Sequence, residues 1–261
     1  MNRPLYDQLV KYYEVLEGRD WKTEVDLVEF ILQGHKCQSV VDLGCGTGFH
    51  VRALRKRGIR ATGIDISEEN IAYARKIARQ NRIPSSTFVV ASYYNYRPRK
   101  QFDAAICLNW SVPIRDDEIL RFLSNTYVLL RPGGILIFDY ERTSQIVRSD
   151  VGQAIVESWR LKGEVAVRVS VGQLKSSVLF SRDVYLFFPA SSNWETPNEK
   201  TRYNLSKCPQ DVKVYRDVSC VRFFSISEIR KIAAKSGFRL ISNFALPRKK
   251  YVRSYAVLEK C

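Results

Sequence analysis

Residues 39–65 contain the feature that most constrains the fold, a glycine-rich turn between two short apolar segments. The first segment, Ser-Val-Val-Asp-Leu, is typical of a buried strand, and Gly44, Gly46 and Gly48 follow it at two-residue intervals. Glycine lets the backbone turn tightly and approach a ligand where a Cβ atom would clash. Asp65 ends the next apolar segment, where doubly wound α/β folds place a carboxylate that binds ribose hydroxyls. The pattern predicts a nucleoside-binding corner.

The glycine spacing separates two classes of such corners. Dinucleotide-binding folds use G-x-G-x-x-G, but Phe49 stands here at the third glycine position. The run Asp-Leu-Gly-Cys-Gly-Thr-Gly instead resembles the first motif of class I S-adenosylmethionine (SAM)-dependent methyltransferases. The resemblance implies an α/β, Rossmann-like sheet with helices on both faces and SAM as the cofactor. It also implies that Gly44, Cys45 and Gly46 line the cofactor and that Asp65 binds its ribose.

The same resemblance gives roles to the residues that follow the second and third expected strands. Ile66 is expected to pack on the adenine face, although core packing would explain an isoleucine equally well. Ser92 stands where the family often has an acidic residue for the adenine amino group. A hydroxyl brings no charge, so adenine recognition is expected to depend more on the backbone of Tyr93.

The fourth expected strand delivers Asn109, Trp110 and Ser111 to the carboxyl edge of the sheet, where ligands of open α/β sheets bind. This segment resembles the family's fourth motif, which borders the methionine arm of SAM. It lacks the Asn-Pro-Pro-Tyr or Asp-Pro-Pro-Tyr sequence of enzymes that methylate base amino groups. A base amino methyltransferase is therefore disfavoured.

Residues 1–34 are expected to form N-terminal lid helices, because apolar side chains recur there at helical spacing. Tyr13 and Trp21 resemble the lid positions of small-molecule methyltransferases, including sugar-amine N-methyltransferases, which close over the sulfonium. The alternative is an aromatic stripe packed as core.

Strand and helix alternate through the core, which predicts a parallel sheet with crossover helices. After the fifth strand the rhythm changes to Val-, Phe- and Tyr-rich segments separated by turn residues, which indicates an antiparallel β insertion. The expected organisation is a SAM-binding core at 35–145, a substrate-binding insertion at 146–221, and a closing helix with the last core strands at 222–261. Expected strands are 39–44, 60–65, 87–91, 102–109, 134–140, 163–172, 176–189, 211–223, 238–245 and 252–259, and expected helices are 48–57, 68–81, 116–130 and 225–236.

The charge distribution bears on the acceptor. Residues 1–140 carry 20 Lys and Arg against 16 Asp and Glu, whereas residues 141–261 carry 22 against 11. The basic excess has two readings, a solvated surface or a site for an anionic acceptor. Tyr140, Trp159 and Arg222 are the candidate substrate contacts.

Cysteine and histidine usage points away from metal or nucleophilic chemistry. The six cysteines have no C-x-x-C spacing, and His35 and His50 are the only histidines, so reduced thiols and no metal site are expected. We expect both histidines to be structural or exposed. The absence of an apolar N-terminal stretch or a span of membrane length predicts a cytoplasmic location.

These observations predict SAM-dependent methyl transfer to a nitrogen or oxygen atom of a small molecule. In-line displacement with proximity catalysis requires no dedicated base for an acceptor that binds deprotonated. Two alternatives stay open, an RNA or protein methyltransferase that uses the basic half, and a non-catalytic SAM-binding partner subunit. No motif in the sequence indicates the oligomeric state or the identity of the acceptor.

Overall fold

A computed structural model describes residues 4–17, 20–109, 112–145, 151–189, 212–247 and 252–261. The chain divides into two compact units. The larger contains residues 1–146, 176–178 and 221–261, and the smaller contains residues 147–175 and 179–220.

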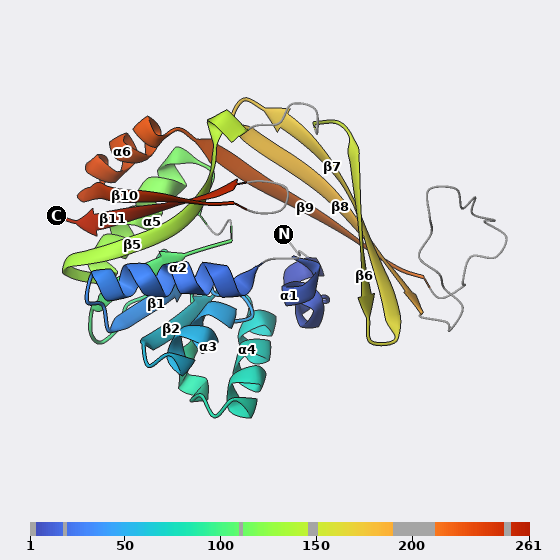
Figure 1. Cartoon of the computed structure of the whole chain (residues 1–261), viewed down its shortest axis with the longest axis horizontal. Helices are drawn as coiled ribbons and strands as arrows, with labels where there is room; N and C mark the ends of the chain where they lie inside the picture. The colour runs from blue at the N-terminus through green and yellow to red at the C-terminus, as the bar shows by residue number, and fades with distance from the viewer. Residues whose placement is uncertain (1–3, 18–19, 110–111, 146–150, 190–211, 248–251) are drawn as a thin grey trace. The chain divides into compact units, whose positions relative to one another are not determined.

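The larger unit is built on one sheet with the strand order β3-β2-β1-β4-β5-β11-β10 (Figure 1). The first five strands are parallel, and β11 runs antiparallel to both β5 and β10. The strands are β1 (Ser39–Leu43), β2 (Arg60–Asp65), β3 (Phe88–Val90), β4 (Phe102–Cys107), β5 (Leu130–Arg142), β10 (Phe238–Pro247) and β11 (Val252–Lys260). This arrangement confirms the predicted Rossmann-like sheet.

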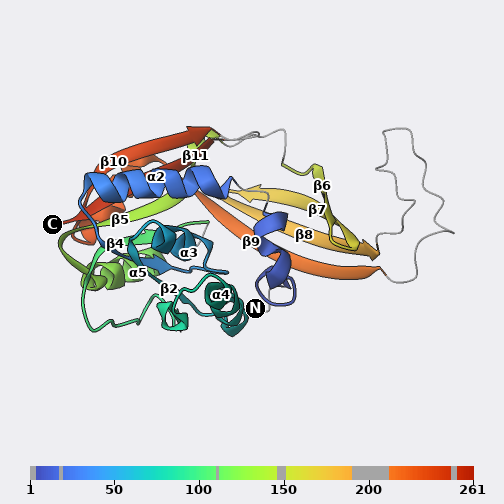
Figure 2. The same ribbon diagram turned by 60° about the horizontal axis from the view of Figure 1, so that its bottom comes forward.

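Helices cover both faces of this sheet (Figure 2). Buried side chains of α2, α3 and α4 pack with Val40, Ile106 and Ile137 on one face. Those of α5 and α6 pack with neighbouring strand residues on the other face. The helices are η1 (Pro4–Tyr6), η2 (Val10–Tyr12), α1 (Tyr13–Leu16), α2 (Trp21–Gly34), α3 (Phe49–Lys56), α4 (Glu68–Gln80), η3 (Ser85–Thr87), α5 (Asp116–Leu129), η4 (Thr143–Gln145) and α6 (Ile226–Lys235).

Local sequence explains where helices of the core begin. Ser67 caps α4, because its side chain accepts a hydrogen bond from the Asn70 amide, and Ser225 with Glu228 forms a capping box on α6. Gly48 precedes α3 with a φ of 76°. A Cβ atom there would lie 2.3 Å from the Phe88 ring, so only glycine fits this turn.

The insertion follows β5 and contains β6 (Ala154–Leu161), β7 (Glu164–Lys175), β8 (Val178–Pro189) and β9 (Lys213–Phe224). The neighbours run in the order β9-β8-β7-β6, and β6 pairs with β7 antiparallel. The predicted antiparallel insertion after the fifth strand is thus confirmed as part of the fold class.

Two expectations were wrong in detail. Strand β6 was not predicted, because its sequence lacks the dense Val, Phe and Tyr pattern of the other insertion strands and most of its residues are exposed. The fifth strand was expected at 134–140, but β5 already begins at Leu130 and includes Pro132 and Gly133. The pairing register of β4 with β5 shifts at this point, so these residues form an irregularity in the strand.

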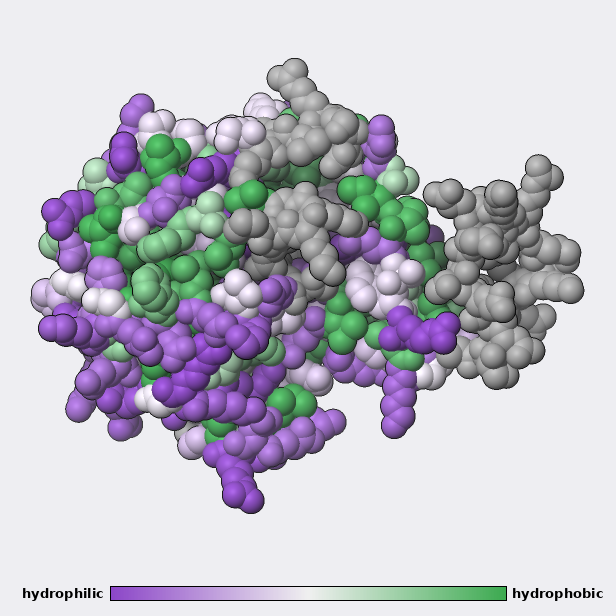
Figure 3. All heavy atoms as spheres, in the orientation of Figure 1, coloured by the Kyte–Doolittle hydropathy of each residue, from purple (hydrophilic) through white to green (hydrophobic). Residues whose placement is uncertain are grey.

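The surface over α3 and α4 is mainly hydrophilic, as Figure 3 shows, which matches helices whose opposite side packs on the sheet. Among the described helices, none has the length and apolar character needed to cross a membrane.

Candidate active site

The glycine turn after β1 follows a left-handed backbone path that glycine adopts readily. Gly44, Gly46 and Gly48 have φ values of 83°, 51° and 76°, a region that favours glycine. The amides of Gly44 and Cys45 both donate to the carbonyl oxygen of Ile64 at 2.9 Å. The turn is therefore fastened to the end of β2, where Asp65 lies.

Asp65 connects the glycine turn to α4. Its Oδ2 accepts a 2.8 Å hydrogen bond from the Gly46 amide, and its Oδ1 accepts a 2.8 Å bond from the Ser67 amide. Burial raises the pKa of Asp65 above its ordinary value, although these amide hydrogen bonds oppose the shift. The Asn70 side chain and the Ile66 amide are further hydrogen-bond donors that lower the pKa of Asp65.

Asp42, at the end of β1, is a site residue that the sequence analysis missed. It is 2% exposed, and its Oδ2 has no hydrogen-bond partner in the described structure. Burial raises the pKa of Asp42 to about 7, and the nearby Asp65 and Glu24 carboxylates add to the shift. A charged residue inside an otherwise apolar strand was the signal that could have found it, because an unpaired buried carboxylate is costly.

A cleft lies between the glycine turn and the N-terminal segment. The predicted residues Tyr13, Trp21, Gly44, Cys45, Gly46 and Asn109 line it together, as do Asp42, Thr47, Phe49, His50 and Leu108. The structure thus brings the expected lid residues and the expected cofactor loop to one place.

Trp21 is held from two sides. Its indole Nε1 donates to the Glu14 carbonyl oxygen at 3.0 Å, and its ring contacts Phe49 and His50 with centroids at 5.1 and 5.6 Å. Tyr13 is 7% exposed and its ring lies 6.2 Å from the Trp21 ring. The two aromatic residues therefore form one wall of the cleft.

A buried chain of polar groups lies behind this wall. His50 Nε2 lies 3.1 Å from Glu24 Oε2, and the Tyr255 hydroxyl donates to Glu24 Oε1 at 2.7 Å. Glu24 is fully buried, so these contacts compensate for its desolvation. His50 is buried and also lines the cleft, so its expected structural role stays a prediction.

The expected adenine positions lie in different environments. Ile66 is 77% exposed, so its side chain is open to solvent. The Ser92 hydroxyl accepts a hydrogen bond from the Tyr94 amide at 3.3 Å. The Tyr93 ring packs on Phe122 at 5.3 Å, and burial raises the pKa of its hydroxyl. The carbonyl oxygen of Tyr93 accepts a hydrogen bond from the Asn125 side chain, and a role of its backbone in adenine binding stays a prediction.

Asn109 stands at the end of β4 with a φ of 66°, which is uncommon for a residue other than glycine. Its Oδ1 accepts a 3.2 Å hydrogen bond from Nη1 of Arg253, and the same nitrogen donates to Asp139 Oδ2 at 2.7 Å. Nη2 of Arg253 lies 3.8 Å from Glu141 Oε1. Trp110 and Ser111, which the sequence places beside Asn109, lie outside the described residues.

The three expected substrate contacts, Tyr140, Trp159 and Arg222, do not line one common site among the described residues. Tyr140 is 3% exposed, and its hydroxyl contacts Asn243 at 2.9 Å. Arg222 donates to the Ile114 carbonyl oxygen at 3.0 Å and to the Asp116 carboxylate. These two bonds hold the segment between β4 and α5 against Arg222. Trp159 belongs to the smaller unit, where the Arg168 guanidinium lies 5.5 Å from its ring. Their roles as substrate contacts stay predictions.

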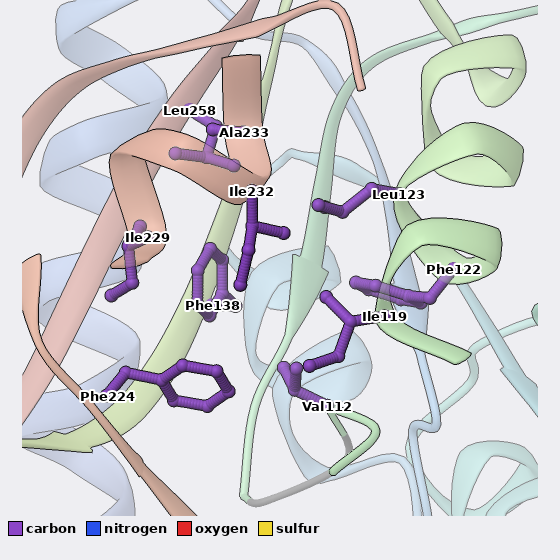
Figure 4. A pocket seen from close by; sticks show the side chains of 10 residues that line it. All are labelled: Val112, Ile119, Phe122, Leu123, Phe138, Phe224, Ile229, Ile232, Ala233 and Leu258. Carbon is purple, nitrogen blue, oxygen red and sulfur yellow. The ribbon is translucent and has the colours of Figure 1, made fainter. Parts of the chain in front are cut away.

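A second hollow lies between α5, α6, β5 and β11 (Figure 4). All of its lining side chains are apolar, so it offers no group that could donate or exchange a proton. The buried thiols of Cys45 and Cys107 are also unsuited to nucleophilic chemistry, because burial raises their pKa well above the ordinary value. No three His, Cys, Asp or Glu side chains of the described residues gather as metal ligands would.

The residues of the cleft fit SAM. The ligand joins a ribose to a methionine part with an ammonium group, and its sulfonium presents an electrophilic methyl group. Asp65 would hold the ribose hydroxyls, and the orphaned Oδ2 of Asp42 would accept the ammonium. The Gly46 backbone leaves space for close approach, since an added Cβ atom would meet nothing nearer than Tyr13 at 4.0 Å.

Comparisons with known proteins agree with this geometry. A methyltransferase-domain family matches residues 40–134. The glycine/sarcosine N-methyltransferase of Parasynechococcus marenigrum is 26% identical over 233 residues, which cover 86% of this chain and 73% of that protein. The ubiquinone biosynthesis O-methyltransferase of Coxiella burnetii is 31% identical over 103 residues, or 40% of this chain and 43% of that protein. The chain spans 58% and 55% of the length of two other curated methyltransferases, from Geobacillus and Bacillus subtilis.

Solved structures resemble the whole chain. CalS10, an amino pentose methyltransferase from Micromonospora echinaspora, aligns with a TM-score of 0.73 at 18% identity and 100% coverage of both chains. The sugar N-methyltransferase KedS8 from Streptoalloteichus aligns with a TM-score of 0.72 at 18% identity, covering 98% of this chain and 94% of that one. At such identities the likeness concerns the fold. Residues 40–134 thus match a methyltransferase domain, and the fold of the chain is that of SAM-dependent methyltransferases of known structure.

Proposed function

We propose that this protein transfers the methyl group of SAM to a nitrogen or oxygen atom of a small molecule. The observation that carries the proposal is the single cleft in which the glycine turn, Asp42 and the aromatic wall of Tyr13 and Trp21 meet. Such an enclosed cleft excludes water from the methyl group and aligns the acceptor, which supplies much of the rate in an in-line displacement.

Relatives support a small acceptor. The structural neighbours include an amino pentose methyltransferase and a sugar N-methyltransferase, and the relatives include enzymes named for glycine and sarcosine or for ubiquinone biosynthesis. We propose that the insertion contributes to acceptor binding, with Trp159 among its contacts. This rests on chain connectivity, because the insertion leaves and rejoins the core at the carboxyl end of β5.

We make two proposals about the acceptor, one for the group that reacts and one for a group elsewhere on the molecule. The basic excess of residues 141–261 supports an anionic group on the acceptor, away from the reacting atom. Around the cleft itself, the described residues include the carboxylates of Asp42, Asp65 and Glu24, which support a neutral or cationic reacting group.

Labelled SAM offers the deciding experiment. The protein is incubated with [methyl-³H]SAM and, separately, with a metabolite extract, total RNA or an unfolded-protein mixture. Label in small molecules is the expected result. Label in RNA or protein would favour the alternative that uses the basic half, with steep salt dependence for RNA. SAM binding without label transfer to any of the three would favour a non-catalytic SAM-binding subunit.

A further inference from the structure

Arg222, near the end of β9, holds the segment between β4 and α5. Its Nη1 donates to the Ile114 carbonyl oxygen at 3.0 Å and to Asp116 Oδ1 at 2.5 Å. Its Nη2 lies 3.7 Å from Glu228 Oε1, and its guanidinium stands 4.8 Å from the centre of the Phe224 ring. Although the Asp116 side chain is 75% exposed, that of Arg222 is only 15% exposed. One guanidinium inside the structure thus joins this segment to the first turns of α5 and α6.

The strand end that carries Arg222 is itself fastened to the core. The next residue, Phe223, pairs with Glu141 of β5, and its amide donates to the Ser177 carbonyl oxygen at 2.7 Å. Phe224 of β9 and Val112 of the held segment both line the apolar hollow that Figure 4 shows. The segment therefore meets β9 at a shared apolar hollow as well as through the Arg222 hydrogen bonds.

The start of the same segment lines the cleft. Leu108 and Asn109 follow β4 directly and line the cleft together with Asp42, so these two residues form the β4 edge of the cleft. Asn109 has a φ of 66°, and a residue other than glycine keeps such a backbone conformation where the surrounding structure holds it. Asn109 accepts the hydrogen bond from Arg253, and the far end of its segment is held by Arg222. The two arginines therefore fix both ends of the segment.

We propose that Arg222 is a positioning residue for the cofactor, which keeps the β4 edge of the cleft in place for the amino-acid part of SAM. The inference rests on the proposed function and gives Arg222 a role other than substrate contact.

The strand order β2-β1-β4 explains why one part of the ligand is affected. Asp42, which would accept the ammonium, stands on β1, and β1 pairs directly with β4. Asp65, which would hold the ribose, ends β2 on the other side of β1. A shift of the β4 edge therefore weakens contacts to the amino-acid part and leaves the ribose contact intact.

Two ligands with the same nucleoside isolate this role. S-adenosylhomocysteine (SAH), which SAM becomes when it gives up its methyl group, retains the amino-acid part, whereas 5′-methylthioadenosine has the nucleoside and the sulfur without it. Calorimetry at pH 8 measures the Kd of both. We expect Arg222→Met to weaken SAH binding about tenfold and to change the Kd of methylthioadenosine by less than about twofold. A general loss of stability would weaken both ligands by the same factor, so the ratio of the two Kd values reports positioning.

Arg115→Met is the matched control, because Arg115 lies in the same segment and pairs with Asp117 of α5, but both side chains are 68% exposed. It should leave both affinities unchanged. Asp116→Asn should weaken SAH binding by a smaller factor than Arg222→Met does. Because both substitutions remove the same contact, their combination should weaken SAH binding by less than the two factors multiplied.

This double-mutant comparison also decides the case if methylthioadenosine binds too weakly to measure. Arg222→Lys, which keeps one charged donor and should keep part of the SAH affinity, replaces Arg222→Met if the latter does not fold. An unchanged Kd for SAH, equal losses for both ligands, or full multiplication of the two factors overturns the proposal. Failure of the wild type to bind SAH at all would instead count against the proposed function.

Discussion

The Thr47 hydroxyl in the glycine turn donates a 2.7 Å hydrogen bond to the Glu14 carboxylate of α1. Glu14 Oε1 also accepts a 2.7 Å bond from Arg52 of α3. The N-terminal segment is thus fastened to the loop that would hold SAM, through a carboxylate rather than through apolar contact alone. We therefore expect that a movement of the N-terminal segment away from the cleft would also loosen the glycine turn.

Glu14→Ala should weaken SAH binding by about 1–2 kcal/mol, because Thr47 and Arg52 lose a charged partner that orders the turn. Calorimetry measures the change. Glu29→Gln is the control, since Glu29 pairs with Arg57, the residue that follows α3, rather than with the glycine turn. Equal losses in both variants would show that the effect is one of general stability.

Removal of residues 1–17 should reduce turnover far more than SAH binding, because the methyl group would be open to water. The deletion stops before α2, whose Val25, Val28 and Leu32 are buried in the core. Single-turnover measurements with labelled SAM test this. A truncated chain that methylates at the full rate would refute the lid.

Asp65→Ala should weaken SAM binding by about 1–3 kcal/mol, because ribose hydroxyls would lose a buried acceptor. The Gly46 and Ser67 amides lose their partner as well, so the thermal midpoint should also fall. Ile66→Ser separates binding from stability. Its exposed side chain contributes little to folding, so affinity should fall while the midpoint stays constant.

SAM affinity should rise with pH through about 7 because of Asp42. In the free protein this carboxyl is protonated below about pH 7, and binding of the ammonium requires its ionised form. Affinity should therefore be about tenfold lower at pH 6 than at pH 8. Asp42→Asn should bind more weakly and lose the dependence. A wild-type profile that is flat between pH 6 and 8 would contradict this role.

Asp42 also affects the stability of the chain without SAM, but there its contribution decreases as the pH rises. The folded chain holds the Asp42 proton more tightly than the unfolded chain does, so this contribution to stability is present below about pH 4 and is lost as the pH rises through about 7. Asp42→Asn should therefore raise the thermal midpoint at pH 8 in the absence of SAM.

Asp103, at the start of β4, has a lowered pKa, so its contribution to stability depends on pH in the opposite direction to that of Asp42. Burial acts to raise its pKa, but the hydrogen bonds from Arg131, Gln38 and Ser39 outweigh it and lower the pKa to about 2. Its contribution to stability, about 2 kcal/mol, is present above pH 4 and lost between about pH 4 and 2. Asp103→Asn should reduce the free energy of unfolding at pH 7 and leave SAH affinity unchanged.

Much of the core could be predicted because local patterns and tertiary structure agree there. The glycine turn, Asp65 and the strands around them follow from positive-φ glycines and apolar runs. Asp42 was missed because its strand reads as apolar, and only burial reveals its orphaned oxygen. The ionic group of Arg253 joins positions 109, 139, 141 and 253, which no local pattern connects. Strand β6 escaped notice because exposed strands carry little apolar periodicity.

The insertion leaves and re-enters the core through neighbouring strands, since Glu141 of β5 pairs with Phe223 of β9 and Arg142 with Phe224. Its two ends are thus one strand spacing apart, about 4.8 Å. Everything between them can lengthen, shorten or be exchanged while the ends keep their register. The segment can therefore be exchanged as one piece, and the acceptor contacts that we propose for it can change without rebuilding the glycine turn and its neighbouring strands.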